Sequence, residues 1–290
     1  MLSTTKIAKA LLSITIGSEP AFYATNNWAN QKKNPFIRAI NYHDTPKKYA
    51  ENFRRQLDWY SKHFDNCNYQ QLRQLLDDGV WDAAKPGLII SFDDGFKSNY
   101  EIAAPLLEEF GFTGWFMIPY AFIDAKKDSH TEFALQNNIA YDSLVQAGDL
   151  AMSWDDIRDL ERRGHIITCH SMNHKRLSDE LTDAQLQEEI ILSKAMLEAK
   201  LGHPITGFTW VGGEEESYSR RAFKFIQQAK YTEVFCTNSE PITGKQNQYF
   251  LERSNIEVDF NMSKLRLVLG GLYDKKYKRK RERIFKLLTV

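Results

Sequence analysis

The chain of 290 residues carries 38 lysine and arginine residues against 38 aspartate and glutamate residues, and 42% of its residues are hydrophobic. This composition, with a mean hydropathy of −0.50, excludes a disordered polyelectrolyte and an integral membrane protein, and the length suffices for one large domain with a core. Zero net charge argues against a uniform surface field for nucleic acid or membrane. The three cysteines lack CxxC spacing and suggest neither a disulfide framework nor a zinc ribbon.

Residues 1–35 are predicted to form a segment that precedes the main domain. Lys6 and Lys9 come before a short apolar stretch, residues 10–16, which is at the lower length limit for the hydrophobic region of a signal peptide. Polar residues interrupt this stretch, and a Gly-Ser-Glu-Pro sequence follows it at once. We therefore expect an ordinary terminal element rather than a cleaved signal peptide, and a cytoplasmic protein.

Short apolar runs rich in β-branched and aromatic residues alternate with segments of helical periodicity, which favours parallel strands covered by helices. Residues 53–64, 103–110 and 182–201 have the helical pattern, and the last of these has a capping box at Thr182 and a terminating glycine at Gly202. Residues 124–149 break the alternation and are predicted to form an excursion on the loop side of the sheet. The seven predicted strands are residues 36–42, 87–92, 113–118, 165–169, 205–211, 232–236 and 250–258.

Two adjacent carboxylates, Asp93 and Asp94, directly follow the predicted strand 87–92. In α/β folds the carboxyl ends of the strands are where sites are built. Successive strand residues point to opposite faces, but Gly95 lets the chain turn, so that both carboxylates can converge on one cleft. A turn in which an aspartate caps the next helix explains these residues equally well when they are taken alone.

Two histidines, His170 and His174, follow the predicted strand 165–169 in the same way. Imidazoles four residues apart on a helical turn can reach one metal ion. Taken alone, the pair would be interpreted as surface or capping residues. Together with one aspartate of the first cluster, it makes a ligand set suited to zinc or another borderline divalent ion, with positions left for water and substrate.

These clusters resemble the first two motifs of the polysaccharide deacetylase superfamily, also called NodB homology or carbohydrate esterase family 4. Ser91-Phe-Asp-Asp-Gly95 resembles the first motif, usually written TFDDG, and His170-Ser-Met-Asn-His174 resembles the second, H-S/T-x-x-H. The resemblance covers roughly residues 36–258. It implies a single-domain α/β fold, a distorted (β/α)7-type barrel, with the catalytic domain at residues 36–260, and it agrees with the strands predicted from run lengths.

Carried over position by position, the resemblance makes Asp94, His170 and His174 the ligands of a divalent metal ion. Zinc is expected, and cobalt, nickel or manganese are the alternatives. The resemblance makes Asp93 the general base. A bound cation would acidify its water and polarise the amide carbonyl, while Asp93 takes the water's proton. A protonated group must then reach the leaving amine nitrogen.

The resemblance identifies the general acid less directly. Many relatives carry a histidine in a late motif, but no histidine follows His203 in this sequence. His43 is the best candidate, since it ends the first predicted strand and since Tyr42-His43 resembles the Tyr-His of the poly-N-acetylglucosamine deacetylase-like subgroup. Imidazole also has a suitable pKa. The alternative is a strand-end histidine satisfied by a neighbouring backbone group. His165 is predicted to be structural, because it begins a strand and lies away from the expected catalytic end.

The third family motif is where this sequence departs from the pattern. Val211 stands where many relatives have proline, and the arginine of the motif is absent. The resemblance still aligns Gly213 with the substrate pocket, and Trp210 either stacks on a sugar ring there or packs in the core. Further along the chain, Arg253 either reaches the carboxylate of Asp93, as a catalytic residue, or braces a barrel strand.

Residues 261–290 are predicted to form a basic helical tail, in which residues 275–286 hold eight basic side chains and one acidic one. A solvated terminal helix is the plain interpretation. An anionic membrane surface or an acidic carrier is the alternative partner, which would make the protein membrane-peripheral. No specific nucleic-acid partner is expected.

The combined motifs predict a metal-dependent hydrolase of C–N amide bonds. It would remove an acyl group, expected to be acetyl, from an N-acylated sugar in a glycan or glycan precursor. The altered third motif leaves a non-catalytic glycan-binding relative as an alternative. A hydrolase of another small amide, such as a cyclic amide or imide, ranks lower, because such relatives commonly lack the metal ligands present here.

Overall fold

The computed structural model of this chain describes residues 18, 22, 35–141, 150–244 and 246–289. The apolar stretch at residues 10–16 and the last part of the predicted excursion, residues 142–149, lie outside the described residues. None of the helices in the described part combines the length and apolar character needed to cross a bilayer.

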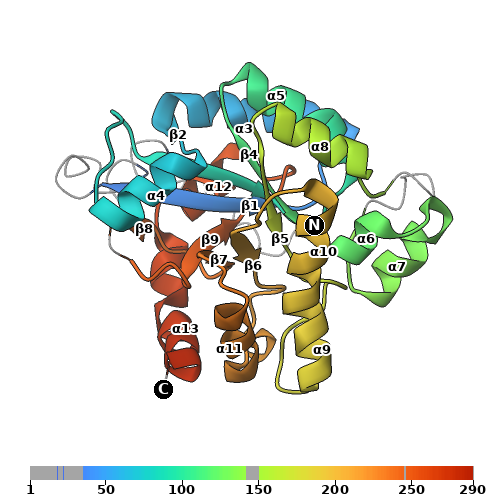
Figure 1. The fold of residues 1–290 in the computed structure, drawn as a ribbon. Coiled ribbons are helices and arrows are strands. Elements are labelled where there is room, and N and C mark those ends of the chain that lie inside the picture. Colours follow the sequence, from blue (N-terminus) through green and yellow to red (C-terminus); the bar gives the residue numbers. More distant parts are fainter. Residues whose placement is uncertain (1–17, 19–21, 23–34, 142–149, 245, 290) are drawn as a thin grey trace, which may run out of the picture.

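A closed barrel of parallel strands forms the centre of the molecule (Figure 1). The barrel closes because β1 pairs in parallel with β3 on one side and with β9 on the other. Of the nine strands that the described residues form, β2 (Asp65–Asn66) and β8 (Ile242–Thr243) pair with β3 and β1 outside this ring of seven. All seven predicted strands and the (β/α)7-type barrel are therefore confirmed. Around the ring, the strands are β1 (Phe36–Tyr42), β3 (Gly87–Phe92), β4 (Gly114–Ile118), β5 (Ile166–Cys169), β6 (Gly207–Thr209), β7 (Glu233–Cys236) and β9 (Leu251–Asn255).

Helices surround this barrel (Figure 1). The predicted helix at residues 182–201 is present as α9 (Asp183–Gln187), a π-helical turn and α10 (Ser193–Leu201). It begins with the expected capping box at Thr182 and ends at Gly202 with φ of 81°. The other main helices are α3 (Ala50–His63), α4 (Tyr69–Asp78), α5 (Ala104–Glu109), α6 (Tyr120–Asp124), α7 (His130–Gln136), α8 (Trp154–Arg162), α11 (Arg220–Gln228), α12 (Met262–Leu269) and α13 (Leu272–Thr289).

Alternate strand residues fill one buried cluster, in which they meet the leucines of α4. Members from the strands include Ala39, Ile89 and Leu251, all buried with at most 1% exposure. Side chains on one face of a strand recur every second residue, so the same face continues through Asn41, Asp93 and Arg253 toward the carboxyl ends. Apolar residues therefore fill the interior, and polar residues succeed them where the strands end, which is where the candidate site lies.

Candidate metal centre and catalytic groups

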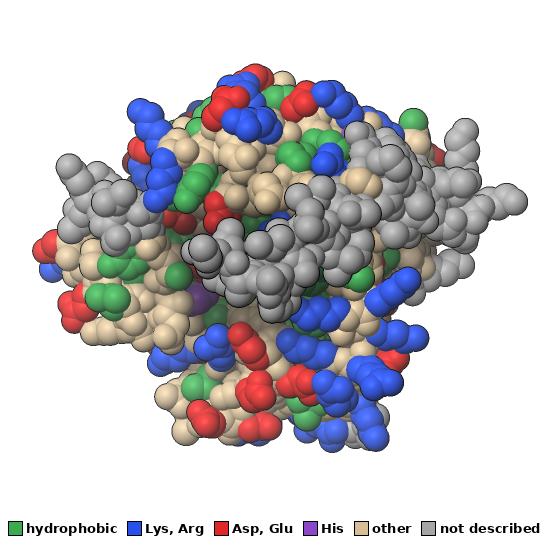
Figure 2. All heavy atoms as spheres, turned by 180° about the vertical axis from the view of Figure 1, so that it is seen from behind, with side chains coloured by type: hydrophobic (Ala, Val, Ile, Leu, Met, Phe, Trp, Pro, Cys, Tyr) green, Lys and Arg blue, Asp and Glu red, His purple; other side chains and the backbone are tan. Residues whose placement is uncertain are grey.

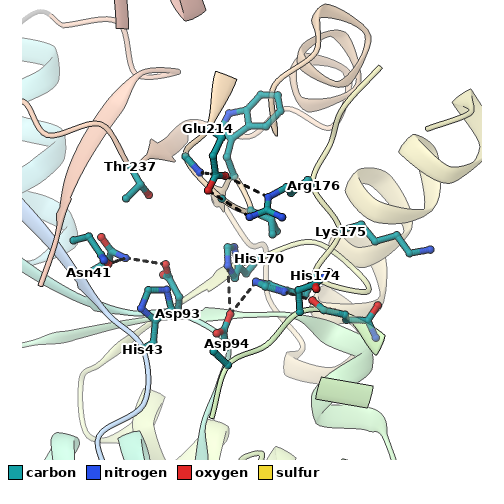
Figure 3. Close-up of a pocket in the computed structure, with 18 of the residues that line it drawn as sticks. Asn41, His43, Asp93, Asp94, His170, His174, Lys175, Arg176, Glu214 and Thr237 are labelled. Atoms are coloured by element: carbon teal, nitrogen blue, oxygen red, sulfur yellow. Dashed lines mark hydrogen bonds and ion pairs between the residues drawn. The ribbon is translucent and has the colours of Figure 1, made fainter. Parts of the chain in front are cut away.

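Three side chains from the ends of two strands converge on one point. Asp94 follows β3, and His170 and His174 follow β5. Each residue offers one ligand atom, and these atoms all lie within 4.8 Å of one another. Asp94 Oδ1 is 3.6 Å from His170 Nε2 and 3.1 Å from His174 Nε2. Figure 3 shows both imidazoles pointing toward the Asp94 carboxylate. The structure thus brings together the three residues predicted to bind a metal ion.

Unusual backbone geometry directs these side chains. Asp94 has φ of 72° and Gly95 has φ of 71°, so the chain turns sharply as it leaves β3. In the second cluster, Ser171 and His174 have φ of 69° and 55°. Positive φ is unfavourable for residues other than glycine, and such residues gather at functional sites where the surrounding structure holds them in place. The turn allowed by Gly95 therefore does what the sequence predicted: it places two successive carboxylates in one cleft.

Backbone carbonyls orient both imidazole rings. His170 Nδ1 lies 3.1 Å from the carbonyl oxygen of Thr209, and His174 Nδ1 lies 2.9 Å from that of Asn137. A carbonyl oxygen only accepts hydrogen bonds, so each Nδ1 carries a proton and each Nε2 is the ring atom that faces Asp94. Histidines that bind metals are held by the same kind of second contact, which sets the tautomer and the ring orientation.

A buried carboxylate, Glu189, holds the loop that carries these two histidines. Its Oε2 accepts hydrogen bonds from the backbone N–H groups of Met172 at 3.1 Å and Asn173 at 2.8 Å. Its Oε1 accepts a third, from Asn173 Nδ2 at 2.9 Å. The glutamate comes from the π-helical turn between α9 and α10. Glu189 was not predicted, since nothing in its local sequence indicates a contact with the second motif.

The protonation states suit a divalent cation. Burial lowers the pKa of His170 to about 4, so that this imidazole is neutral at pH 7. Burial would raise the pKa of Asp94, but His174 outweighs it and the pKa lies below its ordinary value. Asp94 Oδ1 is buried and accepts no well-aligned hydrogen bond, although it is within ion-pair distance of both imidazoles. Burial would lower the pKa of His174, but the charge of Asp94 and its hydrogen bond outweigh burial and raise that pKa, so a cation that binds here displaces a proton from this ring. One carboxylate oxygen and two imidazole Nε2 atoms around one point match the donor set that zinc prefers.

The second carboxylate, Asp93, is held by the guanidinium of Arg253, which lies in β9. Arg253 Nη1 donates to Asp93 Oδ1 at 2.6 Å, and Arg253 Nη2 donates to Oδ2 at 3.0 Å. Asn41 Nδ2 donates to Oδ2 as well, at 3.3 Å. Burial would raise the pKa of Asp93, but Arg253 overcomes this effect and keeps the pKa below its ordinary value. Arg253 also braces the barrel, since its Nε donates to the Cys236 carbonyl oxygen of β7 at 3.4 Å and its Nη1 to Ser91 Oγ of β3 at 3.0 Å, so the structure contains both of the contacts considered for it.

His43 lies at the end of β1, beside the two aspartates (Figure 3). Its Nδ1 is 3.1 Å from Glu257 Oε1, and its side chain remains 37% exposed. Burial lowers the pKa of His43, but the hydrogen bond to Glu257 and the charges of Asp94 and Asp93 raise it to about 9. The imidazole is therefore protonated at pH 7, while Asp93 is ionised. The partner of His43 is therefore the carboxylate of Glu257, whereas the alternative considered from the sequence was a backbone group.

The remaining histidines of the described residues lie elsewhere. His165, at the start of β5, accepts a hydrogen bond from the Gly114 N–H at 2.9 Å and contacts Glu108. His63 and His130 are buried against backbone carbonyls, and His203 pairs with Glu161. Among the described residues that line the site cavity, the histidines are His43, His170 and His174.

The third motif forms one wall of the cavity. Trp210 lines it but is only 1% exposed, because its ring packs on Tyr218 with 4.9 Å between centroids. Gly213 also lines it, and a Cβ built there would lie 2.9 Å from the Thr237 carbonyl oxygen. Stacking of a sugar on Trp210 and substrate contact at Gly213 stay predictions, with the indole largely engaged in packing.

The cavity itself is large and open to solvent, with a volume of about 1670 Å³. The metal-site residues lie in its wall, and it extends to Tyr277, Lys280 and Leu287 of α13. Space of this size is larger than the ~300–1,000 Å³ typical of small-ligand pockets. The geometry therefore suits a large ligand that presents one group to Asp94 and His170.

Comparisons with known proteins agree with this geometry. A model of the polysaccharide deacetylase family matches residues 82–234. No curated protein sequence matches the chain. The fold is similar to that of the Streptococcus pyogenes deacetylase PplD, solved in complex with acetate, with a TM-score of 0.64, 15% identity, and coverage of 81% of this chain and 99% of that one.

Two further solved structures share the fold. A de-N-acetylase from Aggregatibacter actinomycetemcomitans has a TM-score of 0.61 and 16% identity, over 79% of this chain and 98% of that one. The BpsB deacetylase domain from Bordetella bronchiseptica has a TM-score of 0.61 and 17% identity, over 77% of this chain and 96% of that one. At these identities the structural likeness establishes the fold.

Proposed function

The chain belongs to the polysaccharide deacetylase family, and we propose that it is a metal-dependent hydrolase that removes an N-acetyl group from an amino sugar in a glycan or glycan precursor. The observation that carries this proposal is the convergence of Asp94, His170 and His174 beside a second carboxylate. The ligand atoms already face one point, and Asp93 and His43 flank it with opposite charges.

A metal ion held by Asp94, His170 and His174, zinc first and cobalt, nickel or manganese as alternatives, would supply Lewis-acid polarisation of the amide carbonyl and of the attacking water. The remaining chemistry belongs to the side chains of the chain. Asp93 accepts the proton that the water loses as its oxygen forms the new bond to the carbonyl carbon. Arg253 holds the carboxylate in place through two hydrogen bonds, which fixes its direction.

The leaving nitrogen needs a proton, because an amide anion is a very poor leaving group. His43 supplies it as the C–N bond breaks, which leaves acetate and a free amine on the sugar. Its pairing with Glu257 keeps the imidazole protonated at neutral pH. Environments that push the pKa values of two neighbouring groups apart are a mark of an acid and base pair.

The test combines metal analysis with acetate release. Purified protein loaded with zinc or cobalt is expected to bind one ion per chain and to release acetate from N-acetylhexosamine oligomers. Asp94→Ala is expected to lose the ion, and Asp93→Asn to retain the ion but lose turnover. Asp128→Asn, an exposed aspartate outside the cavity, is the matched control and should keep both. Full activity of Asp94→Ala, or no stoichiometric metal in the wild type, would contradict the proposal.

A second candidate function is glycan binding without turnover, which the altered third motif favours. Val211 stands in place of the proline and Trp210 is packed in the wall, so this wall of the cavity differs from the family pattern. This candidate predicts saccharide binding by both the wild type and Asp93→Asn, with acetate release by neither. Calorimetric binding and acetate assays on the same two proteins separate the candidates.

A further inference from the structure

The C-terminal helix α13 is unusually basic for a helix that packs on a barrel. Of its 18 residues, eight are lysine or arginine and two are acidic. These charges divide into cations used within the fold and cations that face solvent. The basic residues are Lys275, Lys276, Lys278, Arg279, Lys280, Arg281, Arg283 and Lys286.

One side of α13 is firmly attached to the barrel. Ile284 and Leu288 are buried, with 2% and 3% exposure. Arg281 Nη1 donates to the carbonyl oxygens of Asn238 at 2.9 Å and Ser239 at 2.7 Å. Asp274, in the first turn, accepts two hydrogen bonds from Arg38 of β1, at 2.8 and 2.7 Å. The helix therefore has a fixed orientation relative to the barrel, and anything that binds its outer side also orients the barrel.

The outer side carries five exposed cations that pair with no carboxylate among the residues the structure describes. Lys275, Arg279 and Lys286 follow the i, i+4, i+11 spacing that places them along one line of the helix surface. Ile284 and Leu288 on the opposite side of the helix are buried, so this line of cations faces solvent. Figure 2 shows lysine and arginine side chains gathered at the lower right, where α13 lies in that view. The five cations are Lys275, Lys276, Lys278, Arg279 and Lys286.

Large apolar side chains are exposed on the same helix. Phe285 and Leu287 retain 48% and 39% exposure, and Leu272 at the other end retains 46%. Basic helices with exposed aromatic and aliphatic residues are typical of elements that lie in the interface of a bilayer, where the cations meet anionic headgroups and the apolar groups enter the acyl boundary. A soluble polyanion would satisfy the cations but would leave in water Leu272 and the exposed part of Phe285, whose ring packs on Phe250 with 5.0 Å between centroids.

The helix α13 also forms part of the wall of the active-site cavity. Tyr277, Lys280 and Leu287 of α13 line the same cavity as Asp94 and His170. We propose that α13 docks on the surface of an anionic lipid bilayer, so that the mouth of the cavity lies at that surface. The docking itself is independent of the proposed deacetylation. Its consequence, access to glycans held at the membrane, rests on the proposed function.

Vesicle sedimentation with the full chain tests the docking. Wild-type protein is expected to partition onto phosphatidylcholine vesicles that contain phosphatidylglycerol, to release from them at high salt, and not to bind pure phosphatidylcholine. A triple variant, Lys275→Glu with Arg279→Glu and Lys286→Glu, should lower the partition coefficient by about a hundredfold or more. The substitution F285S should weaken partitioning as well, while leaving its salt dependence intact.

The matched control reverses three exposed lysines away from α13, by Lys126→Glu, Lys127→Glu and Lys230→Glu. This control makes the same change in net charge and should bind anionic vesicles as the wild type does. Circular dichroism checks that all variants are folded, and acetate release from soluble oligomers provides a separate readout for the proposed function. Three results would each overturn the docking: no partitioning of the wild type, equal losses in both triple variants, or binding of a DNA oligonucleotide without binding of anionic vesicles.

Discussion

Replacing Glu257 by glutamine is expected to move the alkaline limb of the kcat/KM profile to lower pH. Glu257 Oε1 lies 3.1 Å from His43 Nδ1 in the structure. Glutamine keeps a hydrogen-bond acceptor of nearly the same shape at this position but removes the negative charge. The variant therefore isolates the electrostatic support of the proposed acid from its positioning.

The size of this shift follows from the contacts of His43. Burial lowers its pKa, and among the influences that raise it to about 9 the hydrogen bond to Glu257 is the largest. A neighbouring opposite charge shifts a pKa by about 1–3 units, and the 37% exposure of the His43 side chain places the effect at the low end. We therefore expect a displacement of about one pH unit.

The direction of the shift is also determined by the raised pKa. The protonated form of His43 is fully present below the ordinary value of 6.5 and is lost as pH rises through about 9. Without the negative charge of Glu257, His43 loses its proton at a lower pH. The alkaline limb of kcat/KM for acetate release, which reports the essential acid of the free enzyme, is the quantity to measure.

Asp259→Asn is the matched control for Glu257→Gln. Asp259 is an exposed carboxylate that lines the same cavity two residues further along the chain, so the control removes the same charge without removing a partner of His43. The control profile should stay close to that of the wild type. Equal displacement of the limb in both variants, or no displacement in Glu257→Gln, would refute the pairing as the cause of the raised pKa.

Three further predictions concern groups around the site. Arg253→Leu should destabilise the fold by about 3–5 kcal/mol in urea unfolding, because it leaves the buried carboxylate of Asp93 uncompensated, and a much smaller loss in an Asp93→Asn background would confirm this cause. Glu189→Ala should weaken metal affinity about 10–100-fold in chelator competition, since it releases the loop that carries both histidines, and unchanged affinity would contradict this role. Gly213→Ala should cost about 1–3 kcal/mol of unfolding free energy, because its Cβ would lie 2.9 Å from the carbonyl oxygen of Thr237, and a wild-type unfolding curve would show that the loop relaxes.

Local patterns in the sequence were sufficient to predict the strands and the residues at their ends. A buried parallel strand requires a short run of apolar and β-branched residues, and a turn directly after it requires a residue such as Gly95, so both leave a local signal. Asp93 and Asp94 and the pair of histidines are also separated by fixed short spacings. For the same reason the capping box at Thr182 and the stop at Gly202 were predictable, since both act within one helical turn.

Only the tertiary structure shows that Arg253 both contacts Asp93 and braces neighbouring strands, and that Glu257 accompanies His43. Closure of the barrel places β9 beside β1, which brings Arg253 onto a carboxylate 160 residues away and Glu257 onto an imidazole 214 residues away. It also determined that α13 buries Ile284 and exposes Phe285. Contacts of this kind depend on which elements become neighbours when the core forms, and a local pattern of residues carries no record of the partner across the barrel.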